Sequence, residues 1–169
     1  MLPQQLHSER IKLDRRIRNL LLIFIAGLAF SGITAFPLEW ELDLARRLLA
    51  YVRLDSALTK WINFAYEGVH ETNSRYPFIA YGTDWLAFAH LLIAVLFIGP
   101  LRDPARHVWV IEFGMIACLG IFPLALIAGE IRGIPFFWRL FDCLFGVVGG
   151  VVLFFCYRDI AKMEILNVK

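Results

Sequence analysis

Four apolar runs, each about as long as a membrane-crossing helix, constrain this chain more than any other feature. They cover residues 20–36, 79–99, 107–128 and 138–157. A helix of about 20 apolar residues crosses the hydrocarbon core of a bilayer and satisfies its own backbone groups there. The sequence therefore predicts an all-α integral membrane protein, with four transmembrane helices packed in a compact bundle. We expect a single polytopic domain over residues 1–169.

The composition supports this class and excludes others. Hydrophobic residues make up 59% of the chain, against about 45–50% in a typical soluble domain. The formal net charge is only +2, and no basic stripe alternates with aromatic residues, so no nucleic-acid partner is predicted. The cysteines Cys118, Cys143 and Cys156 all fall inside apolar runs and form no metal-binding spacing. We expect them to be packing residues, and we predict no metal and no cofactor.

The segments outside the runs are polar or amphipathic. Residues 1–19 are basic and predict a short amphipathic helix on the membrane surface. In residues 37–78 the apolar positions recur at helical spacing, which predicts one or two amphipathic surface helices, closed by a turn at "HETNSRYP". Pro123 predicts a kink in the third run. A short polar tail is expected after residue 157.

The first run has an alternative reading as a cleaved signal peptide. Its charged lead is long and includes Glu9 and Asp14, and its exit lacks an A-x-A site. We therefore predict an uncleaved first span.

The distribution of Lys and Arg predicts the orientation. Ten of the 17 lie in the N-terminal segment, the 100–107 turn and the C-terminal tail. Cytoplasmic segments near span ends carry an excess of these residues. We therefore expect both termini in the cytoplasm and residues 37–78 outside, in the inner membrane if the source is bacterial.

Small residues four positions apart predict where the helices pack. Gly27 and Ser31 form such a pair in the first run, and Gly146 and Gly150 form a GxxxG pair in the fourth. Small residues let helix backbones approach closely in lipid. The pattern fits packing inside one bundle, and it equally fits a homo-oligomer or contact with other membrane subunits.

His90 is an ionisable residue near the middle of the second run. It lies about 15 Å deep, at about 1.5 Å per residue, on a helix face that it shares with small residues. It either hydrogen-bonds a neighbouring helix or serves as a proton relay, cofactor ligand or substrate contact. A bis-histidine haem would need a second histidine at the same depth, and His7, His70 and His107 do not meet that need.

Charged residues near the outer ends of the second, third and fourth runs predict an ionic cluster. Its members are Asp84, Glu130, Arg132, Arg139 and Asp142. Isolated carboxylates at that depth are costly, so pairing is expected. The cluster is either an interfacial salt-bridge network or an outward-facing pocket for an ion or a small polar ligand. Glu71, Asn73 and Arg75 are candidates to complete that pocket from the preceding segment.

Three classes of function remain open. The leading one is a non-enzymatic accessory or self-associating subunit of a membrane complex, since no catalytic signature is present. The second is binding or transport of a small ligand or ion through the ionic pocket. The third is a membrane-embedded redox protein or enzyme that uses His90.

Overall fold

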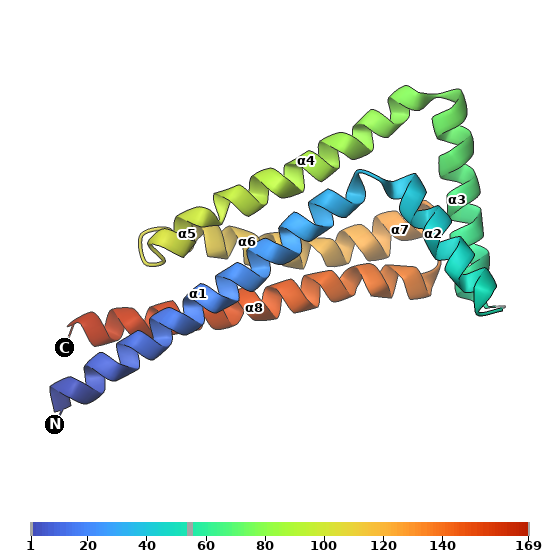
Figure 1. Ribbon diagram of the computed structural model, residues 1–169. Helices are drawn as coiled ribbons and strands as arrows, with labels where there is room; N and C mark the ends of the chain where they lie inside the picture. Colours follow the sequence, from blue (N-terminus) through green and yellow to red (C-terminus); the bar gives the residue numbers. More distant parts are fainter. Residues whose placement is uncertain (1, 54–55, 169) are drawn as a thin grey trace. The chain divides into compact units, whose positions relative to one another are not determined.

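The computed structural model describes residues 2–53 and 56–168, and within these ranges every regular element is a helix (Figure 1). Four helical segments are long and apolar enough to cross a membrane: His7–Ala35, Pro77–Arg102, Val108–Ile131 and Phe136–Leu166. Each includes nearly all of one of the four predicted runs. The prediction of an all-α chain with four such helices is confirmed.

The elements follow one another along the chain with short connections. In order they are α1 (Leu2–Ala35), α2 (Leu38–Tyr51), α3 (Ala57–Arg75), the 3-10 turn η1 (Pro77–Ile79), α4 (Ala80–Leu96), α5 (Ile98–Arg102), α6 (Val108–Pro123), the π-helical turn η2 (Leu124–Ala128), α7 (Gly129–Ile131) and α8 (Phe136–Val168).

The described chain divides into two compact units. Unit 1 holds the residues up to Gly27 and those from Ala94 onward, and unit 2 holds Leu28–Ile93. The prediction of one polytopic domain stays a prediction.

The first and last helices are longer than the sequence analysis expected. α1 is continuous from Leu2, so the basic segment is not a separate short helix, because no Gly or Pro interrupts residues 4–26. α8 likewise continues to Val168 in place of a polar tail after residue 157. The apolar helix in α8 has 31 residues, about 46 Å at 1.5 Å per residue, which exceeds the roughly 30 Å hydrocarbon core.

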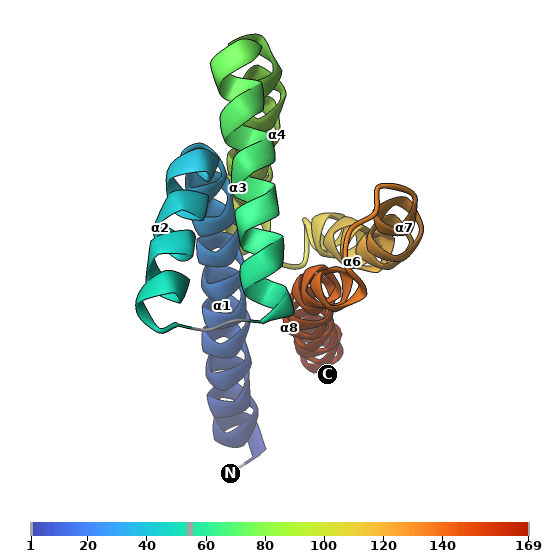
Figure 2. The same ribbon diagram turned by 90° about the vertical axis from the view of Figure 1, so that its right-hand side faces the viewer.

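In unit 2 the segment between the first two runs forms a pair of helices, α2 and α3, which lie side by side (Figures 1 and 2). Arg53, with φ of 55°, follows the end of α2, and the Ser56 side chain accepts a hydrogen bond from the Thr59 backbone N–H to cap α3. α3 runs through Arg75, so "HETNSR" is helical, and the predicted turn is limited to the residues before Pro77.

In unit 1 the helices α6 and α8 pack side by side (Figure 1). α6 ends at Pro123 and continues as the wider turn η2. Proline has no backbone N–H to donate within the α-helix, and the wider π turn follows directly after Pro123. The irregularity falls where Pro123 predicted a kink. The backbone then reverses at Gly133, whose φ of +70° favours glycine, before α8 begins.

The long helices bury small residues and expose large apolar ones. Ala87 in α4 and Cys118 in α6 are buried, and the burial of Cys118 is what a packing residue requires. In contrast, the exposed fractions of Phe30 and Ile33 in α1 reach 70% and 61%, and similar side chains are exposed along α4, α6 and α8. An apolar surface of this extent needs a covering of lipid or protein.

Candidate functional site

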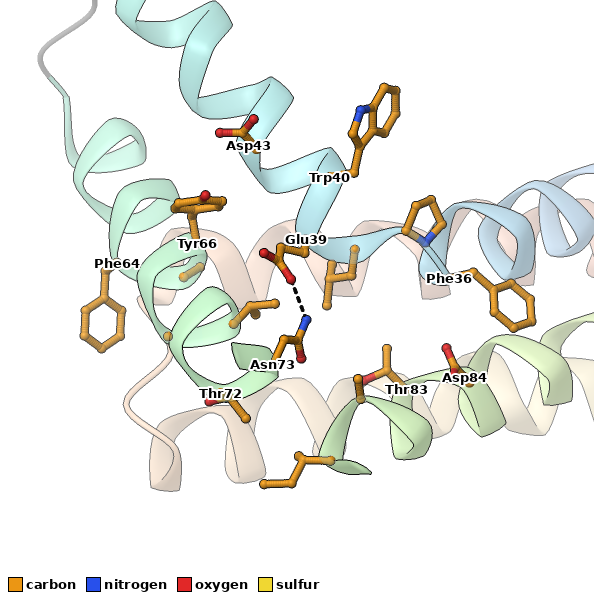
Figure 3. Close-up of a pocket in the computed structure, with 17 residues that line it drawn as sticks. Phe36, Glu39, Trp40, Asp43, Phe64, Tyr66, Thr72, Asn73, Thr83 and Asp84 are labelled. Carbon is orange, nitrogen blue, oxygen red and sulfur yellow. Dashed lines mark hydrogen bonds between the residues drawn. The ribbon is translucent and has the colours of Figure 1, made fainter. Parts of the chain in front are cut away.

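A pocket lined by residues 36–84 lies in unit 2. It measures about 910 Å³ and is bounded by the α1–α2 corner, one face each of α2 and α3, and the start of α4 (Figure 3). We call it the Glu39–Asp84 cavity. Its polar and aromatic lining side chains are Phe36, Glu39, Trp40, Asp43, Phe64, Tyr66, Thr72, Asn73, Thr83 and Asp84.

Glu39 links the two helices that wall the cavity. His70 Nδ1 lies 2.6 Å from its Oε1. Asn73 Nδ2 donates to its Oε2 at 2.7 Å, the bond that is dashed in Figure 3. His70 also stacks on Tyr66, with ring centroids 5.5 Å apart. The two hydrogen bonds, with that from His70 the stronger influence, hold the pKa of Glu39 below its ordinary value. The carboxylate is thus satisfied by α3 and holds α3 against the first turn of α2.

Asp43 is satisfied within its own helix. It accepts from Arg46 at 2.8 Å and from Arg47 at 2.6 Å, one turn along α2. Hydrogen bonds from these two guanidinium groups lower the pKa of Asp43. The Arg46 guanidinium also lies over the Tyr66 ring, 4.2 Å from its centroid, which adds a second contact between α2 and α3.

Asp84 stands apart from these pairs. It lies in the second turn of α4, is half-buried, and has no hydrogen-bond or ion-pair partner among residues 2–53 and 56–168. Figure 3 shows Thr83 and Asp84 pointing from α4 toward the space below the α1–α2 corner. A smaller hollow of about 270 Å³ adjoins Asp84 and is otherwise lined by Phe36, Tyr81, Trp85 and Phe88. Asp84 therefore borders both spaces.

The other members of the predicted ionic cluster lie in unit 1. Arg139 forms a salt bridge with Glu130, donates to the Leu126 carbonyl oxygen at 3.3 Å, and is largely buried. Arg132 is exposed at the end of α7, and Asp142 is half-buried in α8. The Arg139–Glu130 pair ties the link before α8 to α8 itself. A cluster that joins all five residues, Asp84 included, stays a prediction.

His90 forms a local contact. Its Nδ1 lies 2.8 Å from the Leu86 carbonyl oxygen, one turn earlier in α4, and its side chain is half-buried. One ring nitrogen is thus satisfied by its own helix rather than by a neighbouring one. Within the described residues no group of three or more His, Cys, Asp or Glu side chains is placed to hold a metal ion.

The predicted glycine contact in α8 lies against α6. A Cβ on Gly146 would lie 2.8 Å from the Cys118 carbonyl oxygen, and one on Gly149 would lie 3.0 Å from Cys118 Sγ. Gly150 has an ordinary contact, at 3.6 Å from Cys118 Cβ. The glycines of α8 therefore form a shallow recess for the backbone and side chain of Cys118, inside the same chain.

In α1 the close contact falls on a glycine that the pattern missed. A Cβ on Gly27 would meet nothing within 4 Å among the described atoms, and Ser31 is half-buried. Gly32 is the tight position, since a Cβ there would lie 2.9 Å from the Ala87 carbonyl oxygen. At about 100° per residue, Gly32 lies about 140° around the helix from Gly27 and about 100° from Ser31, so it belongs to a different face from the Gly27–Ser31 pair.

A fully buried carboxylate in unit 1 also escaped the sequence analysis. Asp159 in α8 has an exposed fraction of 0%, and its Oδ2 lies 3.1 Å from Arg16 Nε of α1. Arg158 is a more distant second partner at 3.7 Å. The pair joins the first and last helices, and a charge of this kind is kept only with such a partner. The sequence signal for this pair was the position of Asp159, which lies in line with the apolar face of α8 in the segment that was predicted to be a polar tail.

Comparison with protein-family models, with curated proteins and with solved structures finds no match for this chain. The fold and the site define the class: an all-α protein with four helices long and apolar enough to cross a membrane, and an acidic, aromatic cavity between the first two of them along the chain.

Proposed function

We propose that this chain is an integral membrane protein that crosses the bilayer four times and binds a small ligand in the Glu39–Asp84 cavity. The cavity carries the proposal. Ligand pockets typically measure about 300–1,000 Å³ and combine apolar or aromatic walls with a few polar groups. This cavity measures about 910 Å³, with four aromatic and three carboxylate side chains on its walls.

Membrane insertion is supported by the lengths and surfaces of the helices. Each apolar segment has at least 24 residues, about 36 Å at 1.5 Å per residue, enough to cross a roughly 30 Å core. Their large apolar side chains are largely exposed, as contact with lipid requires. Because the cavity follows the first span and precedes the second, it lies across the membrane from both termini. The bias of Lys and Arg toward the termini supports an orientation with the cavity outside the cytoplasm.

The polar side chains around the cavity are held in place by their neighbours, which supports ligand binding rather than a purely structural pairing of α2 with α3. Glu39 and Asp43 are held by neighbouring side chains, and Arg46 is stacked on Tyr66, so these groups are fixed in place. Preorganised polar groups reduce the cost of binding.

The alternative of an accessory or self-associating subunit rests on the absence of a catalytic signature and on small-residue pairs such as the GxxxG pair. Gly146 and Gly150 contact Cys118 of the same chain, so that pattern has an explanation that needs no second subunit. The redox alternative rested on His90, whose Nδ1 bonds its own helix. Binding in the cavity is therefore the better supported function.

The experiment is native mass spectrometry of the protein extracted under mild conditions. Ala65 lines the cavity, and Ala65→Trp fills part of it. Ala50 is exposed at the far end of α2 and does not line the cavity, so Ala50→Trp is the matched control. We expect a small-molecule mass on the wild type and on Ala50→Trp, and its loss from Ala65→Trp. A bare protein in all three, or equal retention by both variants, contradicts the proposal.

A further inference from the structure

The charges on the walls of the Glu39–Asp84 cavity are all of one sign. Three carboxylates line it, and its described lining includes no Lys or Arg. Two of these carboxylates are compensated, Glu39 by the side chains of α3 and Asp43 by its own helix. Asp84 alone has no partner among the described residues. A ligand that enters this space therefore meets one unpaired carboxylate.

The surroundings of Asp84 are aromatic on both sides. Phe36 lines both the cavity and the adjoining hollow, and Tyr81, Trp85 and Phe88 complete the hollow. These rings hold one another edge to face, with Trp85 centroids 6.0 Å from Tyr81 and 6.2 Å from Phe88. Aromatic faces attract cations that are weakly hydrated, and ring edges accept apolar chains.

We infer that the ligand is an organic ammonium ion with an apolar chain or ring, bound with its cationic nitrogen at Asp84 and its apolar part in the hollow of Phe36, Tyr81, Trp85 and Phe88. The inference rests on the proposed ligand binding and adds the chemical class. An anion would meet the unpaired carboxylate of Asp84, and the described lining of the cavity holds no Lys or Arg to bind it. A small inorganic cation would leave the aromatic hollow unused, and the described residues offer no cluster of three metal-binding side chains.

Two sources share this chemistry. One is a free amphipathic amine that enters from the aqueous side. The other is a phospholipid whose headgroup carries an ammonium, since the cavity lies where the first span ends and the second begins. The test must therefore include both a soluble amine and a lipid arm.

The soluble probe is 4-phenylbutylammonium, with the uncharged 4-phenylbutanol as its matched partner. Binding is measured on the full chain in nanodiscs of phosphatidylglycerol, a lipid without an ammonium group. We expect saturable binding of the amine, at least about tenfold weaker binding of the alcohol, and a similar loss for the amine in Asp84→Asn. Asp142→Asn, which removes a half-buried carboxylate of α8 outside the cavity, should bind the amine as the wild type does. Asp84→Glu, which keeps the charge, should restore most of the binding.

In the lipid experiment the protein is given phosphatidylethanolamine and phosphatidylglycerol in equal amounts, and native mass spectrometry identifies the lipid that stays bound. Selective retention of the ethanolamine lipid by the wild type and Asp142→Asn, and not by Asp84→Asn, supports the inference with lipid as the source. Saturable amine binding that depends on Asp84 supports it with a free amine as the source. Equal binding of amine and alcohol, equal binding by wild type and Asp84→Asn, or no binding in either arm overturns it.

The same samples separate this inference from the proposed function. A neutral or anionic ligand that is lost from Ala65→Trp and retained by Asp84→Asn would overturn the ammonium assignment and leave ligand binding in the cavity intact. Absence of any ligand from every sample would overturn both.

Discussion

Replacing Gly146 by alanine should weaken the packing of α8 on α6, while the same change at Gly120 should not. The added Cβ at position 146 would lie 2.8 Å from the Cys118 carbonyl oxygen, where ordinary contacts begin at 3.4 Å. The obstacle is backbone, so one helix must move by about 0.6 Å. Overpacking of this kind costs about 1–3 kcal/mol. In the opposite direction, alanine stabilises a helix by about 0.5–1 kcal/mol relative to glycine.

Gly120 in α6 supplies the matched control, because a Cβ there would meet nothing within 4 Å among the described residues. Gly120→Ala therefore gains only the higher helix propensity of alanine, so its stability should equal or slightly exceed that of the wild type. Because the gain in helix propensity is common to both variants, the difference between their free energies of unfolding isolates the steric cost at Gly146, about 1–3 kcal/mol. The assay is unfolding in mixed micelles by sodium dodecyl sulfate, followed by circular dichroism. Equal stabilities for the two variants would refute the close approach of α6 and α8.

Two further perturbations test other contacts. Arg16→Gln should lower the free energy of unfolding by about 3 kcal/mol, the low end of the cost of removing one partner of a buried ion pair. We expect the low end because Asp159 is fully buried while the Arg16 side chain is 50% exposed. Thermal unfolding should show this loss, and the exposed control Arg15→Gln should unfold as the wild type does. Acidification should loosen the packing of α2 on α3. The pKa of Glu39 is lowered in the folded chain, so the stability that the ionised Glu39 gives to this pairing is present above the ordinary pKa of 4.5 and is lost as the pH falls below it. Hydrogen-exchange protection factors of α2 and α3, which correct for the intrinsic slowing of exchange in acid, should therefore fall below that pH in the wild type, and Glu39→Gln should flatten this pH dependence. An unchanged dependence in the variant would count against the link.

The four long helices could be predicted because hydropathy is a local property. Each run of about 20 apolar residues carries its own signal, and each lies almost entirely within one of the four long helical segments. The helix ends were harder. The basic start of α1 and the segment after residue 157 in α8 are charged, yet neither contains a helix breaker, and both continue the helix.

The cavity could be predicted only in part, because its parts are far apart in sequence. Asp84 was singled out by its depth in an apolar run, and Asn73 by its place before that run. Glu39 was missed, although it holds Asn73 and His70 from 34 and 31 residues away. These bonds also explain why the polar end of α3 stays helical, against its turn-like composition. Contacts of this kind follow from the pairing of α2 with α3, which no local pattern specifies.

The most direct test of the account locates the cavity relative to the termini. Thr72 lines the cavity, and Glu164 is exposed near the end of α8. A cysteine is placed at one of these positions after Cys118, Cys143 and Cys156 are replaced by alanine, and sealed vesicles of known orientation are treated with a membrane-impermeant maleimide. The account predicts that Thr72→Cys reacts from the outer side and Glu164→Cys from the cytoplasmic side. Reaction of both from the same side would contradict a four-span protein with an outward-facing cavity.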